Sequence, residues 1–430
     1  MTDFDIIIVG AGAAGLMAAR ELSRSGRSVA ILEANNRIGG RIHTLSSNSF
    51  SIPIETGAEF IHGELPLTLK ILNEAGIPLV EMEGETYQVK DGSLQQNDNY
   101  IEGLPVILAK MKELQQDMPL KTFFDEYFSD VKYEATKKSL RRMVEGYDAA
   151  DIRKVSTFSI REELSEGGMN KTIRPAGGYG KMIDFMAEDC GKSGCQIFLS
   201  SIVKDIFWKE GRVEVRCANG EHYTSRKLLL TVSLGVLKCD DNREAYIRFI
   251  PELPGKRSAI KSMEFGTVIK IFMEFREAFW ENKKYNVRQM PGLDFLISDT
   301  PPITAWWTQL PDKTPLITGW MAGPNAEKIQ SLDDDAIFEK TISLLADLFK
   351  TDKSFITGQL KAQKVVNWYT DPYSCGAYAY VSTQSSKARK ILAEPVENTL
   401  FFAGEALYDG SAIGTVEAAL ASALNSGVDK

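Results

Sequence analysis

A glycine-rich turn near the start of the chain limits the possible folds more than any other feature. The run Gly10–Gly15 (GAGAAG) follows a short apolar segment, 4–9, and opens a stretch, 13–25, whose apolar residues recur at helical spacing. A second apolar segment, 28–32, ends at Glu33. Strand, turn, helix and strand in about thirty residues predict a βαβ unit and, with it, a parallel sheet.

The spacing of these residues suits a dinucleotide. Gly10 permits a tight turn, Gly12 lets the backbone approach a pyrophosphate, and Gly15 lets the helix pack closely on the sheet. The helix would offer free N–H groups and the positive end of its dipole to the phosphates. A carboxylate at the end of the second strand, here Glu33, can accept hydrogen bonds from a ribose.

The next residues extend this cradle without identifying the cofactor. Gly39 and Gly40 stand between Arg37 and Arg41, which favours a close backbone approach with guanidinium groups near phosphates. A surface turn with solvated arginines explains the same four residues. The βαβ unit therefore predicts a dinucleotide, and these residues alone leave NAD and FAD open.

Length and composition set further limits. A chain of 430 residues exceeds the usual size of one core, so two domains are expected. The net charge of −8 argues against nucleic acid as a partner and is compatible with a cationic substrate. The five cysteines are spread out and Cys190 and Cys195 lack a second pair, so we expect reduced thiols and no metal. We find neither a basic leader before an apolar run nor an apolar run of membrane-span length, and expect a cytoplasmic protein that does not bind membranes.

The remaining periodicities give a coarse outline of the chain. A mainly helical region is expected over 103–163, with breaks near Pro119 and Gly146. The other expected elements are an alternating strand region over 202–218 with a hairpin turn at Asn219-Gly220, strands over 228–232, 266–275 and 400–402, a helix over 333–349, and a closing helix that starts near Thr415.

Taken in order, several segments make the sequence resemble a known family. They are Gly10–Gly15, 33–41, 55–63 (ETGAEFIHG), 174–178 (RPAGG), the strand at Val203, 266–270 (GTVIK), 368–378 and 402–405 (FAGE). Their joint order and spacing resemble the flavin-containing amine oxidases, which include monoamine oxidases, polyamine oxidases and lysine-specific histone demethylases. The resemblance extends over almost the whole chain.

The resemblance implies an α/β fold with two parts. A discontinuous Rossmann-type FAD-binding domain would comprise 1–80, 180–250 and 365–430. A mixed α+β substrate-binding domain would comprise 81–179 and 251–364. The active site would lie between them, where such sites tend to form.

The resemblance also assigns the cofactor, FAD, to particular residues. It places Glu33 at the adenosine ribose, Arg41 at the pyrophosphate, Val203 at the adenine, and the last helix against the pyrimidine edge of the flavin. The full set is Gly10, Gly12, Ala13, Ala14, Gly15, Glu33, Ala34, Arg37, Gly40, Arg41, Gly57, Ala58, Glu59, Phe60, Val203, Gly404, Glu405, Thr415 and Val416. Monoamine oxidases bind flavin through a cysteine where this chain has Ala377, so the FAD is expected to be non-covalent; Cys375 stands two residues too early for that role.

Three side chains are candidates for the chemistry. Lys270 lies in an apolar strand segment, where a lysine is costly without a partner or a task; the family lysine contacts flavin N5 through a water. The alternative is an edge-strand lysine that reaches solvent. Tyr378 resembles one wall of an aromatic cage that suits an amine, or is a core aromatic. The second wall is also aromatic in monoamine oxidases, whereas the aligned residue here is Thr415, a pattern that resembles polyamine oxidases and histone demethylases. His62 resembles a polyamine oxidase residue, although a structural histidine fits as well.

These features predict an enzyme that passes a hydride from the carbon beside an amine nitrogen to flavin N5, and then electrons to O2 to form hydrogen peroxide. The substrate would be a primary or secondary amine, with polyamines among the candidates. Two alternatives remain, an L-amino-acid oxidase of the same fold and a catalytically silent FAD-binding module. Glu59 and Phe60 stand where the former tends to carry an arginine. A desaturase or protoporphyrinogen-type oxidase is disfavoured by Lys270 and Tyr378 together.

Overall fold

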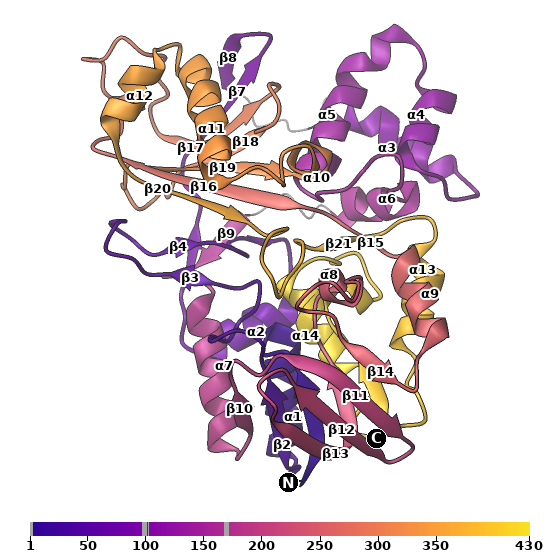
Figure 1. The fold of residues 1–430 in the computed structure, drawn as a ribbon. Helices are drawn as coiled ribbons and strands as arrows, with labels where there is room; N and C mark the ends of the chain where they lie inside the picture. Colours follow the sequence, from indigo (N-terminus) through magenta and orange to yellow (C-terminus); the bar gives the residue numbers. More distant parts are fainter. Residues whose placement is uncertain (1–2, 97–100, 102, 167–171) are drawn as a thin grey trace.

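The computed structural model describes residues 3–96, 101, 103–166 and 172–430, which form two large sheets with helices packed around them (Figure 1). The strands are β1 Asp3–Val9, β2 Val29–Leu32, β3 Thr44–Leu45, β4 Ile54–Glu55, β5 Ile61–His62, β6 Leu79–Glu81, β7 Glu85–Lys90, β8 Ser93–Gln96, β9 Thr172–Pro175, β10 Gln196–Phe198, β11 Val203–Lys209, β12 Arg212–Cys217, β13 His222–Leu230, β14 Arg248–Ile250, β15 Glu264–Phe265, β16 Val268–Phe275, β17 Leu293–Ser298, β18 Ala305–Trp307, β19 Leu316–Ala322, β20 Leu360–Asn367, β21 Ala379–Tyr380 and β22 Leu400–Phe402. The α-helices are α1 Ala13–Arg24, α2 Pro66–Glu74, α3 Leu104–Glu113, α4 Leu120–Tyr127, α5 Glu134–Gly146, α6 Thr157–Glu166, α7 Gly180–Lys192, α8 Leu234–Leu237, α9 Pro254–Ser262, α10 Gly323–Glu327, α11 Asp334–Phe349, α12 Lys353–Gln359, α13 Ser385–Ala393 and α14 Val416–Leu424.

The first sheet contains the predicted βαβ unit. Strand β1 lies between β2 and β13 and is parallel to both, which confirms the parallel strands expected from the sequence. The strand order is β10-β2-β1-β13-β12-β11-β14, and β22 also pairs with β13. Parallel strands are buried on both faces, which is why 4–9 and 28–32 read as apolar runs rather than as alternating ones.

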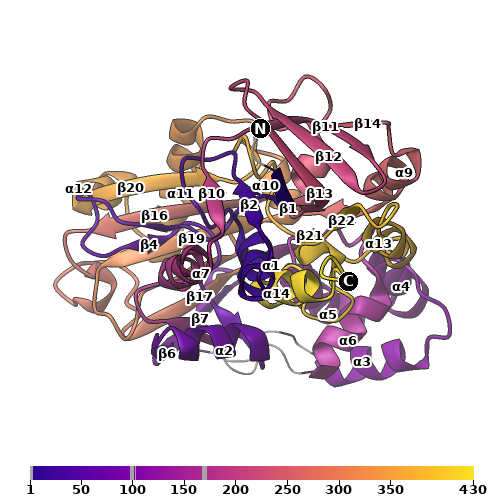
Figure 2. The same ribbon diagram turned by 90° about the horizontal axis from the view of Figure 1, so that it is seen from below.

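Helices cover the two faces of this sheet. On one face Ile6 and Ile8 pack with α1, α7 and α14, and Figure 2 shows α1 beside α14 although the two are almost 400 residues apart in number. On the other face Ile7 and Val9 join a cluster that includes residues of α9 and α13. Helices on both faces of the sheet therefore hold the end of β1, and the turn that follows it, in place.

The second sheet has mixed strand directions, in the order β20-β16-β19-β18-β17-β7-β8. Strand β16 lies between β19 and β20, and all eight of its residues are buried. Ile269 and Ile271 pack against α11 and α12. Lys270 therefore lies on the opposite face of the sheet, where it contacts the segment at Glu55 and Gly57. The edge-strand alternative for Lys270 is therefore wrong.

Two expectations about strands need correction. The region 202–218 is not one strand: β11 and β12 form a hairpin with a turn at Glu210-Gly211. The segment 228–232 is not a separate strand but the end of β13, which starts at His222 after the confirmed Asn219-Gly220 turn. The long β13 pairs antiparallel with β12 and parallel with β1, so its end has the apolar composition of a buried parallel strand.

The helices α3 to α6 form a separate cluster beside the second sheet, with breaks near Pro119 and Gly146 as predicted. The predicted domain limits stay a prediction, and β20 runs across the one at residue 365. Within the part of the chain that the structure describes, no helix combines the length and the apolar character needed to cross a membrane.

Candidate active site

One large cavity, of about 1050 Å³, connects the glycine-rich turn of the first sheet with the second sheet. Its walls include the turn after β1, the end of β2, the segment 57–66, parts of α5 and α6, β16, β18, and the start of α14. Elements that are distant in the sequence thus line one cavity, and their side chains determine what it can bind.

The turn at one end of the cavity has the geometry of a phosphate cradle. Gly10 has φ +107, a conformation that favours glycine. A Cβ on Gly15 would lie 1.9 Å from the Gly10 carbonyl oxygen, so only glycine permits this packing of α1. A Cβ on Gly12 would meet nothing closer than 4.0 Å, which leaves its face open to a ligand. The carboxylate of Glu33 accepts hydrogen bonds from the amides of Ala11 (2.7 Å) and Asn35 (2.9 Å) and faces the same cavity.

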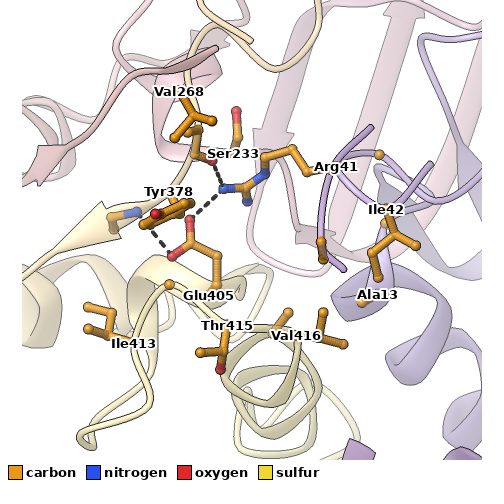
Figure 3. A pocket seen from close by; sticks show the side chains of 18 of the residues that line it. Ala13, Arg41, Ile42, Ser233, Val268, Tyr378, Glu405, Ile413, Thr415 and Val416 are labelled. Atoms are coloured by element: carbon orange, nitrogen blue, oxygen red, sulfur yellow. Dashed lines mark hydrogen bonds and ion pairs between the residues drawn. The ribbon is translucent and has the colours of Figure 1, made fainter. Parts of the chain in front are cut away.

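Arg41 and Glu405 form an ion pair at the wall of the cavity (Figure 3). Arg41 Nη1 donates to Glu405 Oε1 at 2.8 Å and also to the carbonyl of Ala377, while Glu405 accepts from the amide of Ala379. Glu405 is buried, so its charge requires such partners. The arrangement ties the segment before β21 to the segment after β22 and holds Ala377 and Tyr378 at the cavity wall.

The start of α14 and the segment at Gly57 also line the cavity. Thr415 caps α14, because its Oγ1 accepts from the amide of Ala418 at 3.1 Å, and Val416 follows at the wall. A Cβ on Gly57 would lie 1.8 Å from the carbonyl oxygen of Arg41, so this segment also packs as closely as glycine allows. A helix N-terminus stabilises negative charge at this position.

Lys270 forms a buried ion pair with Glu59. Its Nζ donates to Glu59 Oε2 at 2.8 Å and to the carbonyls of Glu55 (2.6 Å) and Gly57 (3.2 Å). Burial alone would raise the pKa of Glu59, but the charges of Lys270 and Arg174 outweigh it and hold the pKa of this carboxyl below its usual value. The predicted flavin-lining residue Glu59 therefore directs its carboxylate to Lys270.

Tyr378 and His62 both line the cavity and are linked through Tyr147. The Tyr378 hydroxyl donates to the carbonyl of Tyr147 at 2.5 Å, and the Tyr147 ring packs edge-on against His62 with ring centres 5.1 Å apart. His62 Nδ1 lies 3.2 Å from Thr172 Oγ1. Burial lowers the pKa of His62 to about 4, so the imidazole is neutral at physiological pH.

Two carboxyl groups also line this part of the cavity. Asp148, just after α5, is hydrogen-bonded to Glu163 of α6. Burial, and secondly the charge of Glu163, raise the pKa of Asp148 well above its usual range, so the pair retains a proton. Asp148 Oδ2 is buried and has no hydrogen-bond partner among the described residues.

Most residues predicted for the site meet at this cavity. All the predicted cofactor and catalytic residues line it except Gly15, which lies beneath the turn, and Arg37, which donates to the carbonyl of Ile38. Trp307 and Trp320 line it as well, whereas Trp306 is in the core of the second sheet. Cys375 lies behind the wall, with its Sγ 3.4 Å from Cys239 Sγ.

Sequence reasoning missed the acidic pair and the partners of Glu59. Asp148 and Glu163 lie fifteen residues apart in a region assigned only as helical, and the sequence signal available was a Tyr-Asp step after a helix break at Gly146. Arg174 was noted within a motif but without a role. Its contact with Glu59 joins segments 115 positions apart, which no local pattern reveals.

Comparisons with known proteins agree with this geometry. The family model described as "Flavin containing amine oxidoreductase" matches residues 13–426. The chain is 28% identical to "Probable polyamine oxidase 4" of Arabidopsis thaliana, over 98% of this chain and 86% of the relative. It is 29% identical to "Lysine-specific histone demethylase 2" of Homo sapiens, over 93% of this chain and 50% of the relative. It spans only 28% of "Lysine-specific histone demethylase 1 homolog 3" of Arabidopsis thaliana.

Solved structures show the same fold. A putrescine oxidase bound to putrescine superposes with a TM-score of 0.79 at 18% identity, over 99% of this chain and 98% of the other. The cyclohexylamine oxidase from Brevibacterium oxydans IH-35A gives 0.76 at 20% identity, over 99% and 98%. The α/β fold and the flavin cofactor predicted from the sequence are confirmed, and the chain belongs to the family of flavin containing amine oxidoreductases.

Proposed function

We propose that the protein uses non-covalently bound FAD to oxidise a primary or secondary amine that carries a second cationic group, with O2 as the electron acceptor. One observation carries the proposal: Lys270, Tyr378 and the Asp148–Glu163 pair line the same cavity as the dinucleotide cradle. The open face of Gly12, the crowded Gly15 and the start of α14 at the cavity wall fit such a cofactor. Bound FAD would accept a hydride at N5 and yield hydrogen peroxide with O2.

The chain would bind the reactive amine in its neutral form. A free alkylamine has a pKa of about 10.4, and a poorly hydrated pocket favours the neutral species. Tyr378, Tyr147, Trp307 and Trp320 supply aromatic walls, and the hydrogen bond from Tyr378 to the Tyr147 carbonyl fixes the ring that would meet the nitrogen. His62 is neutral and therefore adds no positive charge that would repel a cationic substrate.

The acidic pair supports a substrate with two amino groups. Asp148 and Glu163 are kept together by a shared proton although like charges repel. A distal ammonium would supply both the positive charge and the donor that the buried Asp148 Oδ2 lacks. One end of a diamine or polyamine would then be held as an ammonium while the other is oxidised.

The cavity gives little support to an amino-acid substrate. Among the described residues, the arginines that line it are Arg41 and Arg142. Arg41 is paired with Glu405 and Arg142 with Asp299, so neither guanidinium is available to a substrate carboxylate without breaking a pair. An L-amino-acid oxidase would need such a cation.

Anaerobic bleaching of the flavin absorbance tests both parts of the proposal. Purified holoprotein is mixed with monoamines, α,ω-diamines, polyamines, methyl-lysine peptides or L-amino acids, and peroxide release is measured when air is admitted. We expect diamines or polyamines to bleach the flavin fastest. A bound ammonium would displace the proton that the pair retains, and asparagine cannot ionise in this way. Asp148→Asn should therefore raise KM for diamines about 10- to 100-fold, since a hydrogen bond to a charged group contributes about 1.5–3 kcal/mol, and should leave a matched monoamine little changed.

The control variant is Glu64→Gln, another acid at the cavity wall that is exposed to solvent. It should behave like the parent protein. No bleaching by any amine would refute the enzymatic function. Equal losses for diamine and monoamine in Asp148→Asn would refute only the second ammonium site, and bleaching by methyl-lysine peptides alone would indicate a peptide substrate instead.

A further inference from the structure

All three N–H donors of the Lys270 ammonium group are engaged in hydrogen bonds. An ammonium has three N–H donors, and Nζ makes three hydrogen bonds, to two backbone carbonyls and to Glu59 Oε2. The side chain is 1% exposed and that of Glu59 is 4% exposed. Of the three acceptors Glu59 is the one with a charge, so the state and place of the ammonium depend on it.

The orientation of Glu59 is fixed from the other side. Its Oε1 accepts from Trp307 Nε1 (3.1 Å) and Gln309 Nε2 (3.2 Å), and lies 3.5 Å from Arg174 Nη1. Oε1 is thus held by side chains from β9 and from the segment at the end of β18, and Oε2 is left for Lys270. The carboxylate cannot turn without losing several hydrogen bonds at once.

Other charged groups surround this network. Glu55 lies beside both Glu59 and Lys270, and Asp294 of β17 lies near Arg174 and Glu59. Burial raises the pKa of Glu55 to about 7 and that of Asp294 to about 6. Both become neutral more easily than ordinary carboxyl groups, whereas Glu59 stays ionised between Lys270 and Arg174.

We propose that Glu59 is a positioning residue that holds the Lys270 ammonium charged and in place at the cavity wall. This inference rests on the proposed function, since it concerns how Lys270 assists the flavin. With all three N–H groups engaged, Lys270 would act on the cavity chiefly as a fixed positive charge. The bond to the Gly57 carbonyl is the longest of the three and the most easily exchanged for a water.

The test uses Glu59→Gln, which keeps the shape and removes the charge. The flavin of the holoprotein is photoreduced without any amine, and its reoxidation by O2 is followed between pH 6 and pH 10. Removing a negative charge beside a buried ammonium group disfavours its charged form. As the pH rises, the rate of flavin reoxidation should fall in Glu59→Gln at a pH at least one unit lower than in the parent. We expect the rate of the variant to be about tenfold below that of the parent at pH 9, and to differ by less than threefold at pH 6.5.

Two further variants show whether the effect passes through Lys270. In a Lys270→Met background the added Glu59→Gln change should produce no shift of the pH profile. Asp294→Asn removes another buried acid that does not contact Lys270, and should leave the profile of the parent. Superimposable profiles of Glu59→Gln and parent, or the same shift without Lys270, would overturn the proposal.

A readout without cofactor completes the test. In the apoprotein, Lys270→Met leaves the Glu59 carboxylate buried without its closest cation, so the double variant should melt at a higher temperature than Lys270→Met alone. A double variant that melts lower would contradict the pairing. If Glu59→Gln retains no FAD, Glu59→Asp replaces it: the shorter side chain keeps the charge but loosens the contact, and a profile identical to that of the parent would overturn the proposal. Because no amine is used, these outcomes are independent of the substrate tests.

Discussion

The buried carboxyl group of Glu55 makes the stability of this protein depend on pH. Its Oε1 accepts a hydrogen bond from Thr44, while Oε2 is buried without a hydrogen-bond partner among the described residues. Burial raises its pKa from 4.5 to about 7. The folded protein therefore binds this proton over a pH range in which the unfolded chain has released it.

The sign of the effect follows from this difference. Between about pH 4.5 and pH 7 the folded state holds more protons at Glu55, so the free energy of unfolding falls as the pH rises. The full difference is of the order of 3 kcal/mol, since one pKa unit corresponds to about 1.4 kcal/mol. His62 acts in the opposite direction: its pKa of about 4 lies below the usual value, and its contribution is lost as the pH falls toward 4.

Glu55→Gln isolates the first effect. The amide resembles the protonated acid, so parent and variant should have similar stability at pH 4.5. The variant should become more stable than the parent as the pH rises, by up to about 3 kcal/mol, and the gain should level off above pH 7. Urea unfolding of both proteins across this range measures it. A constant difference at every pH would contradict the assignment.

At the scale of single residues, the sequence predicted positions better than partners. Lys270 stood out because a charged residue in an apolar strand segment needs a reason, and Glu33 because it ends the second strand of a βαβ unit. The contact between Lys270 and Glu59 joins residues 211 positions apart. No periodicity encodes such a contact, because it depends on how β16 docks against the segment that contains Gly57.

At the scale of elements, the turn between β1 and α1 depends on Gly15. A Cβ there would meet the Gly10 carbonyl at 1.9 Å and Thr231 Oγ1 at 2.9 Å, so the backbone of the turn itself would have to move. Gly15→Ala should therefore destabilise the protein by about 1–3 kcal/mol, as other overpacked sites do. It should also weaken FAD binding, because this turn would hold the pyrophosphate in the binding mode that we propose.

Gly191→Ala is the matched control. Gly191 lies in α7, and an added Cβ would meet nothing within 4 Å. Alanine has the higher helix propensity, by about 1 kcal/mol, so this variant should be equal to the parent or slightly more stable. Thermal unfolding and the ratio of flavin to protein absorbance compare the two. Equal cofactor loss in both variants would show that Gly15 has no special role.

Elements with a strong local signal were predicted with small errors in their limits. The helix expected over 333–349 is α11, Asp334–Phe349, and the strand over 266–275 is β16, Val268–Phe275. The errors lie where tertiary pairing decides. The end of β13 appeared as a separate strand because the strand passes from an antiparallel partner, β12, to parallel partners, and its composition changes midway. Composition follows burial rather than strand ends.

At the scale of the whole molecule, one cavity joins both sheets. Residues of the first sheet and its turn line one end, and β16 and β18 of the second sheet line the other. The hydrogen bonds of Glu59 to Arg174, Lys270 and Trp307 join the segment after β4 to β9, β16 and β18. The sequence predicted a site between two domains. It could not predict how the two sheets are placed relative to each other, because that depends on long-range contacts in the folded chain.

Cofactor binding should consequently stabilise the molecule as a whole, and only the complete dinucleotide should do so fully. Glu33, Val203, Gly57 and Thr415 all line the cavity. In the binding mode that we propose, Glu33 and Val203 would hold the adenosine half of FAD, and Gly57 and Thr415 would contact the flavin. Ligand at a thousand times its Kd stabilises a protein by about 4 kcal/mol. Apoprotein titrated with FAD should show a rising unfolding temperature, whereas FMN, which lacks the adenosine half, should give a much smaller shift at the same concentration. Equal shifts with FMN and FAD would mean that the glycine-rich turn contributes nothing to binding, and the dinucleotide assignment would then be wrong.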